Sequence, residues 1–361
     1  MAVLGTRPEA IKMCPVIIEL KKRKNVDLYV CITGQHREML RSVLDIFGVR
    51  ADCDLDIMKE GQSLADITKA VLDGISEVLE REKPDVVLVH GDTTTAFAAS
   101  LACFYKKIPV GHVEAGLRTY DVYSPYPEEF NRRAIDITAS YLFAPTRLSA
   151  ENLLREGADE NSIFVTGNTA IDALRLTVRE EYSSPITEAA AGKRIILLTA
   201  HRRESHGEAL RGIFRAVRRI ADEFDDVMIV YPVHPNPVVR AAAEEILSGH
   251  ERIMLTEPLD VIAFHNLMAK GFFIMTDSGG IQEEAPSLGK PVLVLRDVTE
   301  RPEGVEAGTL RIAGTDEEKV YLACKNLLCN ETEYAKMSSA ENPYGDGKAS
   351  RRIADALLSE A

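Results

Sequence analysis

DVVLVHGDTTT, residues 85–95, joins a short apolar run to a turn of polar and small residues. RIILLTAHRRES, residues 194–205, repeats this arrangement in the second half of the chain. Neither apolar run alternates with polar residues, which is typical of a parallel strand covered by helices on both faces of its sheet. The two stretches therefore predict βα units and an α/β fold.

On both sides of residues 85–95, short apolar runs alternate with longer amphipathic segments along the first half of the chain. Strands are predicted over residues 2–4, 28–33, 86–90, 110–113, 141–144 and 163–166. Helices are predicted over residues 10–24, 37–47, 63–81, 95–106, 128–139 and 146–156. Ser63, with Asp66 three residues later, resembles the start of a capping box.

The alternation stops at residues 180–192 (EEYSSPITEAAAG), which we interpret as a linker, and then resumes. Strands are predicted over 195–200, 227–231, 253–255, 272–276 and 292–295, and helices over 208–224, 238–247, 261–270, 281–288 and 317–328. A chain of 361 residues suits two domains of roughly 150 residues each. We predict one doubly wound domain over residues 1–179 and another over 193–345.

The composition argues against several classes of function. Hydrophobic residues make up 45% and charged residues 27%, as in globular proteins. The net charge of −13 argues against a general nucleic-acid binder. No apolar stretch approaches the ~20 residues of a membrane span, and no signal peptide is recognised. The six cysteines form no CxxC pair, so we expect reduced thiols and a cytoplasmic protein without membrane partners.

Polar residues collect where six predicted strands end. These turns are GTRPE (5–9), GDTTT (91–95), EAGLR (114–118), HRRES (201–205), HPNP (234–237) and DSGG (277–280). Ligands of open parallel sheets bind beyond the carboxyl ends of the strands. Six such turns therefore predict a site.

The DSGG turn has the features of a phosphate site. Gly279 and Gly280 let the backbone approach a ligand, and free N–H groups after Ser278 attract phosphate. Glu283 and Glu284 follow within the helix that this turn opens and could reach a ribose diol, with a solvent-facing glutamate as the alternative for either. An ordinary helix N-cap is the alternative.

Several other polar residues suit acid–base chemistry. His201, beside two arginines, suits proton transfer or charge stabilisation toward a departing phosphate. Asp92, Glu114 and the acidic pair at 128–129 supply carboxylates whose pKa values different surroundings can set apart. A structural histidine and a solvated helix start are the respective alternatives. No P-loop, dinucleotide fingerprint or zinc-deaminase pattern is present, so neither a nicotinamide cofactor nor a metal is indicated.

The motifs, taken in order, resemble those of the non-hydrolysing UDP-N-acetylglucosamine 2-epimerases over essentially the whole chain. The matching stretches are GTRPEAIK (5–12), GQHREML (34–40), HGDTTT (90–95), HVEAGLRT (112–119), SPYPEEFNRR (124–133), TGNTAID (166–172), HRRES (201–205), PVHPNP (232–237), DSGGIQEEA (277–285) and RDVTERPE (296–303).

The resemblance implies two Rossmann-like domains in a GT-B arrangement with the active site in the interdomain cleft. It also implies that a C-terminal helix, residues 350–358 within 346–361, returns to the first domain, and that the protein is a homodimer. The implied catalytic residues are Asp92, Glu114, Glu128 and His201. The implied UDP-binding residues are Arg7, Lys12, His234, Phe264, Ser278, Gly279, Gly280, Glu284 and Arg301.

The implied reaction interconverts UDP-N-acetylglucosamine and UDP-N-acetylmannosamine without NAD or metal, for surface polysaccharide or glycan synthesis. UDP would leave to give a 2-acetamidoglucal and then add back with the proton on the other face of C2. Two departures from the family pattern, Glu38 and Gly61, argue against activation by a second nucleotide sugar. A third, Leu259, stands where a glutamine often contacts uracil.

Three other functions stay open at this stage. A GT-B glycosyltransferase would share the fold but would need an acceptor for the sugar. A hydrolysing 2-epimerase would release free N-acetylmannosamine and UDP. A non-catalytic nucleotide-sugar sensor would have no use for the acid–base residues.

Overall fold

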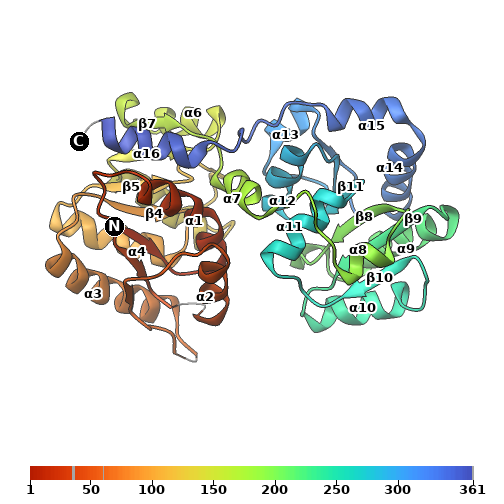
Figure 1. The fold of residues 1–361 in the computed structure, drawn as a ribbon, viewed down its shortest axis with the longest axis horizontal. Coiled ribbons are helices and arrows are strands. Elements are labelled where there is room, and N and C mark those ends of the chain that lie inside the picture. The colour runs from red at the N-terminus through yellow and green to blue at the C-terminus, as the bar shows by residue number, and fades with distance from the viewer. Residues whose placement is uncertain (35–36, 60, 360–361) are drawn as a thin grey trace. The chain divides into compact units, whose positions relative to one another are not determined.

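The computed structural model describes residues 1–34, 37–59 and 61–359, and the side chains of residues 37–39 fall outside this description. It forms two compact units: unit 1 is Met1–Leu176 with Tyr344–Ala361, and unit 2 is Thr177–Pro343. Each unit contains one parallel sheet flanked by helices (Figure 1). The prediction of two doubly wound α/β domains is confirmed.

Unit 1 has a seven-stranded sheet in the order β3-β2-β1-β4-β5-β6-β7. Its strands are β1 (Ala2–Leu4), β2 (Val30–Ile32), β3 (Cys53–Asp54), β4 (Val87–His90), β5 (Val110–Val113), β6 (Tyr141–Ala144) and β7 (Ile163–Val165). The strand order changes direction between β1 and β4, and in doubly wound sheets the loops at such a point form the ligand-binding crevice.

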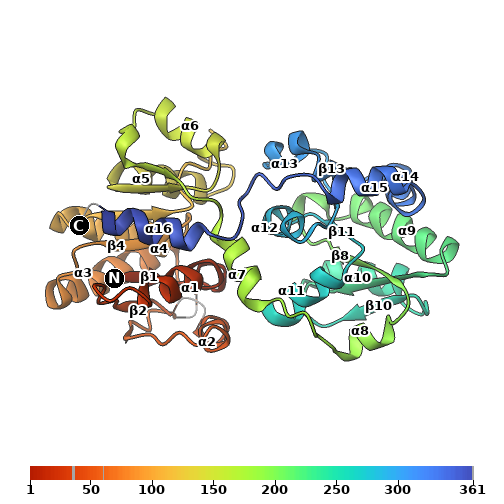
Figure 2. The same cartoon turned by 45° about the horizontal axis from the view of Figure 1, so that its top comes forward.

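The helices of unit 1 form two layers (Figure 2). They are α1 (Arg7–Lys21), α2 (Arg37–Ile46), α3 (Leu64–Glu82), α4 (Thr94–Lys106), α5 (Glu128–Thr138), α6 (Arg147–Arg155), α7 (Thr169–Thr177) and α16 (Ala349–Ser359), with a 3₁₀ turn η1 (Glu160–Ser162). α1 packs against α2 and α16, whereas α4 packs against α3 and α5. The capping box predicted at Ser63 and Asp66 is present at the start of α3.

The two faces of β4 explain why its sequence is apolar throughout. Leu88 packs into the core beneath α1 and α16, and Val89 packs into the core beneath α3 and α4. Both side chains are buried because each layer covers one face of the sheet.

Unit 2 has a six-stranded sheet in the order β10-β9-β8-β11-β12-β13. Its strands are β8 (Arg194–Thr199), β9 (Val227–Pro232), β10 (Ile253–Thr256), β11 (Phe273–Thr276), β12 (Val292–Val294) and β13 (Leu310–Ile312). Its helices are α8 (Pro185–Ala189), α9 (Glu208–Glu223), α10 (Pro237–Leu247), α11 (Val261–Lys270), α12 (Gly279–Glu284), α13 (Pro302–Ala307), α14 (Glu317–Cys329) and α15 (Glu331–Ser338), with 3₁₀ turns η2 (Arg203–Ser205) and η3 (Ala285–Leu288). The order changes direction between β8 and β11, which places the crevice of this sheet.

The unit boundaries differ from the predicted ones. The carbonyl oxygen of Thr177 accepts a hydrogen bond from Nδ2 of Asn266 in α11 at 2.8 Å, and the N–H of Arg179 donates to Oδ1 of Asn266 at 2.7 Å. These contacts attach residues 177–179 to unit 2. The segment 180–192, expected to be a linker, also lies in unit 2 and contains α8, which a capping box at Ser184 starts.

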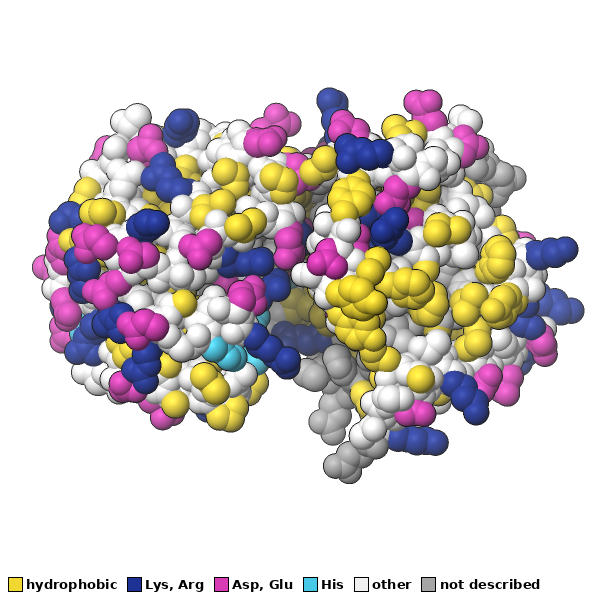
Figure 3. All heavy atoms as spheres, turned by 180° about the vertical axis from the view of Figure 1, so that it is seen from behind, with side chains coloured by type: hydrophobic (Ala, Val, Ile, Leu, Met, Phe, Trp, Pro, Cys, Tyr) yellow, Lys and Arg dark blue, Asp and Glu magenta, His cyan; other side chains and the backbone are white. Residues whose placement is uncertain are grey.

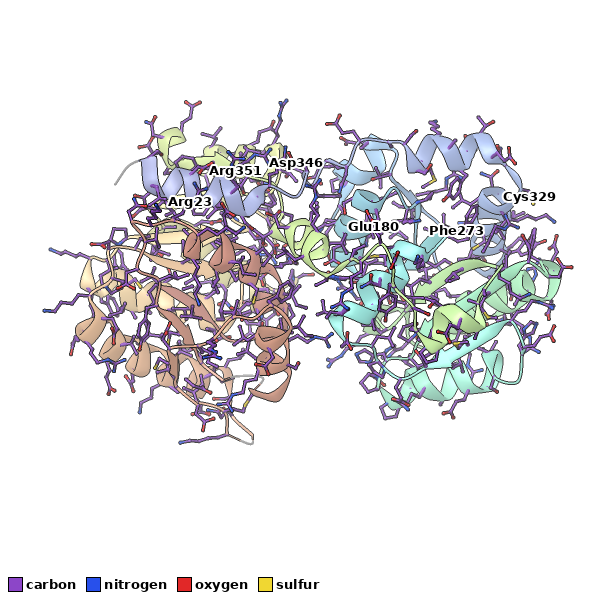
Figure 4. The ribbon with its side chains drawn as sticks, viewed as in Figure 1. Arg23, Glu180, Phe273, Cys329, Asp346 and Arg351 are labelled. Carbon is purple, nitrogen blue, oxygen red and sulfur yellow. The ribbon has the colours of Figure 1, made fainter. Side chains whose placement is uncertain are left out.

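The C-terminal helix α16 belongs to unit 1. Nη2 of Arg23, just after α1, donates to Oδ1 of Asp355 in α16 at 2.7 Å, and Figure 4 shows Arg23 beside this helix. Asp346, before α16, forms a two-pronged ion pair with Arg352 at 2.7 and 2.9 Å. Among the described residues, no helix combines the length and apolar character needed to cross a bilayer.

Candidate functional site

The turn after β1 leaves almost no room for side chains. A Cβ on Gly5 would lie 2.2 Å from Oγ1 of Thr95, so this position requires glycine. The hydroxyl of Thr6 accepts the N–H of Glu9, and the Glu9 carboxylate accepts the N–H of Thr6 at 2.6 Å. This capping box starts α1 at Arg7, which is half-buried beside the crevice of unit 1.

Three groups fix Asp92 in the turn after β4. Nε2 of His112 lies 2.7 Å from the carbonyl oxygen of Gly91. Nδ2 of Asn131 donates to the carbonyl oxygen of Asp92 at 2.9 Å, and the guanidinium of Arg132 forms an ion pair with the Asp92 carboxylate. The predicted catalytic carboxylate thus has a fixed backbone and a cationic partner.

Glu114 follows β5 with a φ of 71°, a left-handed conformation that non-glycine residues adopt only at a cost. Its carboxylate forms an ion pair with Lys12 of α1 and accepts a hydrogen bond from Nδ2 of Asn168 at 3.2 Å. Nε2 of His90 lies 3.5 Å away. Burial by itself raises the pKa of Glu114, but Lys12 and His90 outweigh burial and hold this pKa well below its usual range.

The acidic pair at the start of α5 divides into two roles. Glu129 is fully buried and accepts the backbone N–H groups of Thr119 and Tyr120 at 3.0 Å each. It therefore holds the preceding loop. Glu128 is half-buried, and within the described part of the chain the structure gives its carboxylate no hydrogen bond or ion pair. Of the two acids, Glu128 is the one that a ligand can reach.

A buried network supports the Asp92 turn from below. His112 is fully buried, and its Nδ1 lies 2.5 Å from Oδ1 of Asp136. Arg118 contacts the other oxygen of Asp136 at 2.7 Å and the carboxylate of Glu156 at 2.6 Å. Burial raises the pKa of Asp136, but His112 and Arg118 bring it below its usual value. The buried Asp136 carboxylate therefore has the Arg118 guanidinium as a charged partner inside the unit.

His201 and His234 meet at the crevice of unit 2. Their rings stack with centroids 5.0 Å apart and 8° between the planes. Asp277, which is 1% exposed, accepts the N–H groups of His201 and Arg202 at 2.5 and 2.7 Å. Burial and the neighbouring His201 lower the pKa of His234, so His234 is neutral at pH 7 and offers a ring N–H rather than a charge.

The turn after β11 carries the predicted phosphate-binding residues. The N–H of Ser278 donates to Oγ1 of Thr276 at 3.0 Å. A Cβ on Gly279 would lie 3.3 Å from the Arg301 guanidinium, so Arg301 lies directly against this turn. Arg301 also forms an ion pair with the buried Glu283, which sets Glu283 apart from the more exposed Glu284.

The remaining predicted residues lie around α11. Phe264 and Leu259 are both half-buried, in the first turn of α11 and in the segment before it. His265 is buried, with Nδ1 2.7 Å from Oγ1 of Thr177 and Nε2 3.8 Å from the Glu284 carboxylate. The buried His265 imidazole therefore lies beside the Glu284 carboxylate.

The predicted residues fall into two groups. The first group, called the unit 1 site, comprises Arg7, Lys12, Asp92, Glu114 and Glu128. The second, called the unit 2 site, comprises His201, His234, Phe264, Ser278, Gly279, Gly280, Glu284 and Arg301. Direct contacts join Lys12 to Glu114, His201 to His234, and Arg301 to the glycine turn.

Sequence reasoning missed three residues that touch predicted catalytic groups. Arg132 contacts Asp92 from 40 positions away, Asn168 contacts Glu114 from 54, and Asp277 contacts His201 from 76. All three lie in the recognised motifs, and that position is the only signal the sequence offered for them.

Two of the departures from the family pattern are Glu38 and Gly61. The side chain of Glu38, in α2, lies outside the described residues. Gly61 has a φ of 73°, and a Cβ at this position would meet no described atom within 4 Å. Within the ranges the structure describes, no group of three or more His, Cys, Asp or Glu side chains is arranged to hold a metal ion.

Comparison with known proteins agrees with the motifs. The family model for UDP-N-acetylglucosamine 2-epimerases matches residues 18–358. The Bacillus subtilis UDP-N-acetylglucosamine 2-epimerase is 61% identical over 358 residues, covering 99% of this chain and 94% of its own. The Escherichia coli K12 enzyme is 52% identical, with 99% and 97% covered. The crystal structure of the Neisseria meningitidis UDP-GlcNAc 2-epimerase, bound to UDP-GlcNAc, has a TM-score of 0.90 at 49% identity and covers 99% of both chains.

Proposed function

The chain belongs to the UDP-N-acetylglucosamine 2-epimerase family, and we propose that it interconverts UDP-N-acetylglucosamine and UDP-N-acetylmannosamine without hydrolysing either. The observation that carries the proposal is the unit 1 site, where Asp92 and Glu114 are each paired with a cation and the half-buried Glu128 begins the helix that carries Arg132, the partner of Asp92. Carboxylates in such different surroundings suit proton transfer in both directions. The nucleotide sugar bound by the Neisseria relative supports the choice of substrate.

In the proposed reaction, the unit 2 site binds the UDP moiety. The backbone at Ser278–Gly280 and the Arg301 guanidinium beside it suit the diphosphate. Glu284, with His265 behind it, suits the ribose hydroxyls as a hydrogen-bond acceptor. The neutral His234 adds a ring N–H donor.

The first chemical step is elimination of UDP. A carboxylate of the unit 1 site removes the proton from C2, and the electrons of that C–H bond form the C1–C2 double bond. The C1–O bond breaks, and its electron pair leaves with the UDP oxygen, giving 2-acetamidoglucal and UDP. Positive character at C1 makes the C2 proton acidic, so groups that stabilise the departing diphosphate, Arg7 and His201, accelerate this step.

The second step reverses the first on the other face of the sugar. A protonated carboxyl delivers its proton to C2 from the opposite side, and the UDP oxygen forms the new bond to C1. The group that removed the proton is then protonated and the group that delivered one is deprotonated, so proton exchange with solvent returns both to their starting states before the next turnover. Asp92, Glu114 and Glu128 serve the two faces of C2 between them.

The proposed cycle is redox-neutral, since elimination and addition transfer a proton and a leaving group but no hydride. For that reason we expect turnover without NAD. We expect it without an added metal because arginine and lysine side chains supply cations for the diphosphate and histidine side chains supply ring N–H donors.

We also propose that the protein is a homodimer formed through unit 1. Four large apolar side chains on α4 and α5 are more than half exposed: Phe104, Tyr105, Phe130 and Ile137. Figure 3 shows hydrophobic side chains gathered on the rear face of the molecule, on the half that holds unit 1. Apolar surface of this kind is typical of a face that another chain covers.

Product analysis tests the proposed reaction. UDP-N-acetylglucosamine is incubated with the protein, and the products are separated by anion-exchange chromatography. We expect UDP-N-acetylmannosamine to appear with no loss of total UDP-sugar. Free N-acetylmannosamine with an equal amount of UDP would contradict the non-hydrolysing proposal, and an unchanged substrate would contradict epimerisation altogether.

A further inference from the structure

Asn168 lies in the short turn between β7 and α7 and is 3% exposed. Each of its polar groups has a partner. Nδ2 donates to the Glu114 carboxylate at 3.2 Å, and Oδ1 accepts the N–H of Ala170 at 2.9 Å. The backbone N–H donates to the carbonyl oxygen of Tyr344 at 2.8 Å. One residue thus connects a predicted catalytic carboxylate to two separate stretches of backbone.

Those two stretches are the ones by which the chain passes between the units. The chain leaves unit 1 after Leu176, through α7, and re-enters it at Tyr344. Gly167 and Gly345, beside the Asn168–Tyr344 hydrogen bond, pack so closely that a Cβ on Gly345 would lie 3.1 Å from Cα of Gly167. The two passing segments are therefore fixed to each other at this point.

A second attachment between the same segments does not involve the site. The carboxylate of Asp172, in α7, accepts the N–H groups of Ala349 and Ser350 at 3.1 and 2.8 Å, at the start of α16. Like Asn168, Asp172 joins the passing segments, but its carboxylate binds the start of α16 and not Glu114. It is therefore the matched control for Asn168.

Around Glu114, Asn168 differs in kind from the other two neighbours. Lys12 is an ammonium on a flexible stem, and Nε2 of His90 lies 3.5 Å from the carboxylate, at the limit of a hydrogen bond. Asn168 presents a planar amide whose other end is held by Ala170. It is the neighbour that sets the direction of the carboxylate without adding charge.

We propose that Asn168 is a positioning residue that holds the Glu114 carboxylate in its working orientation and links that orientation to the backbone at Tyr344. This inference rests on the proposed function, since it assigns Glu114 a step in the epimerase reaction. Asn168 acts through Glu114 and is not itself assigned a contact with the sugar.

The test compares N168D, N168A and D172N with the wild-type protein. N168D keeps the acceptor for Ala170 but replaces the amide donor by a carboxylate facing Glu114, Lys12 and His90. We expect kcat to fall by about tenfold to a hundredfold in N168D, with KM within about twofold. The acid limb of its kcat–pH profile should move to higher pH, because a second carboxylate opposes ionisation of Glu114.

N168A should lose a similar fraction of kcat with a smaller movement of the acid limb, because it removes the donor without adding charge. D172N should lower Tm but leave kcat within about twofold of wild type and the acid limb in place. UDP affinity, measured by calorimetry, should be unchanged in all three variants.

Two results would overturn the inference. One is an N168D variant with wild-type kcat and pH profile. The other is an equal loss of kcat and Tm in N168D and D172N with no movement of the acid limb, which would mean that Asn168 is only structural. A wild-type protein without epimerase turnover would overturn the proposed function, and the inference with it.

Discussion

The carboxylate of Asp277 holds His201 by two contacts. Oδ2 of Asp277 accepts the backbone N–H of His201 at 2.5 Å, and Oδ1 lies 3.2 Å from Nδ1 of the same residue. Asp277 follows β11 and His201 follows β8, so the pair bridges the point where the strand order of unit 2 changes direction. Oδ1 makes no hydrogen bond within the described residues, and a buried carboxylate at this distance favours the tautomer with the proton on Nδ1.

D277N tests this relationship. If the amide oxygen keeps the two backbone N–H groups, its NH2 faces Nδ1 and favours the tautomer with the proton on Nε2. We expect kcat to fall by about tenfold to a hundredfold, with UDP affinity kept. The double variant D277N/H201N should be no slower than H201N, because both changes act on one group. An additive loss in steady-state assays would show that Asp277 acts elsewhere.

Replacement of Asp92 tests the unit 1 site. D92N should reduce kcat by at least about a hundredfold, the range of general acid–base catalysis, while UDP binding survives. The matched control is D85N. Asp85 is an exposed acid that precedes the start of β4, whereas Asp92 follows the end of this strand. Steady-state kinetics and calorimetry measure the two effects. Near-normal turnover in D92N would remove this residue from the catalytic group.

The Lys12–Glu114 pair predicts a stability effect that depends on pH. The pKa of Glu114 in the folded protein lies below the ordinary value of 4.5. The stabilising contribution of Glu114 to the free energy of unfolding is therefore fully present above about pH 4.5. That contribution is lost as the pH falls through the depressed folded pKa. K12M removes the cation, raises the pKa of Glu114 and should cost about 3 kcal/mol at pH 7 by leaving a buried carboxylate unpaired.

K12M/E114Q should recover much of that loss, because no unpaired charge remains. Urea unfolding of the wild type and the three variants between pH 4 and 8 measures the coupling free energy. If K12M and E114Q are additive at pH 7, the ion pair contributes nothing to the fold.

Replacement of Gly280 by alanine should change UDP affinity and protein stability in opposite directions. Within the described part of the chain, a Cβ at this position would meet only the Glu284 carboxylate, at 4.0 Å, so alanine fits and should stabilise α12 by up to about 1 kcal/mol. Its methyl group would nevertheless occupy the space where the diphosphate approaches the backbone. We expect G280A to weaken UDP binding by at least about tenfold in calorimetry.

The control for G280A is G249A. Gly249 has a φ of +70°, and no atom of the described residues lies within 4 Å of a Cβ there, so alanine should cost stability without affecting UDP. Wild-type UDP affinity in G280A would argue against backbone contact with the diphosphate.

The apolar face of α4 and α5 predicts an oligomer that charge can disrupt. Ile137 is 85% exposed, and I137K places an ammonium in the middle of the proposed interface. We expect light scattering to show a dimer for the wild type and a monomer for I137K. L322K, on the exposed Leu322 of α14, should remain dimeric. A monomeric wild type would contradict the homodimer.

The sequence predicted the strands of both sheets well because their apolar runs are uninterrupted. It predicted the turns that carry the site because the carboxyl ends of parallel strands share an edge. The edge strands β3 and β13 were missed. β3 has two half-buried residues, and β13 has three residues that run from buried to exposed, so neither gives a long apolar run. α7 was missed too, since its motif, TGNTAID, was taken as a site and not as the start of a helix.

Contacts between distant residues could not be predicted in this way. Periodicity places Asp92 after a strand, but it contains no information that Arg132 faces it. The same holds for Asn168 beside Glu114, since Asn168 follows β7, Glu114 follows β5, and only the folded sheet brings them together. The type and position of the site residues could therefore be predicted from the sequence, but the residues that they contact could not.

One measurement tests the central claim most directly. The wild-type protein is incubated with UDP-N-acetylglucosamine in deuterated water, without NAD or added metal, and followed by proton NMR. The proposed mechanism predicts loss of the C2 proton signal as UDP-N-acetylmannosamine accumulates, since the proton returned to C2 comes from a group in exchange with solvent. Formation of UDP-N-acetylmannosamine that fully retains the C2 proton would contradict that mechanism, and release of free N-acetylmannosamine would contradict the non-hydrolysing function.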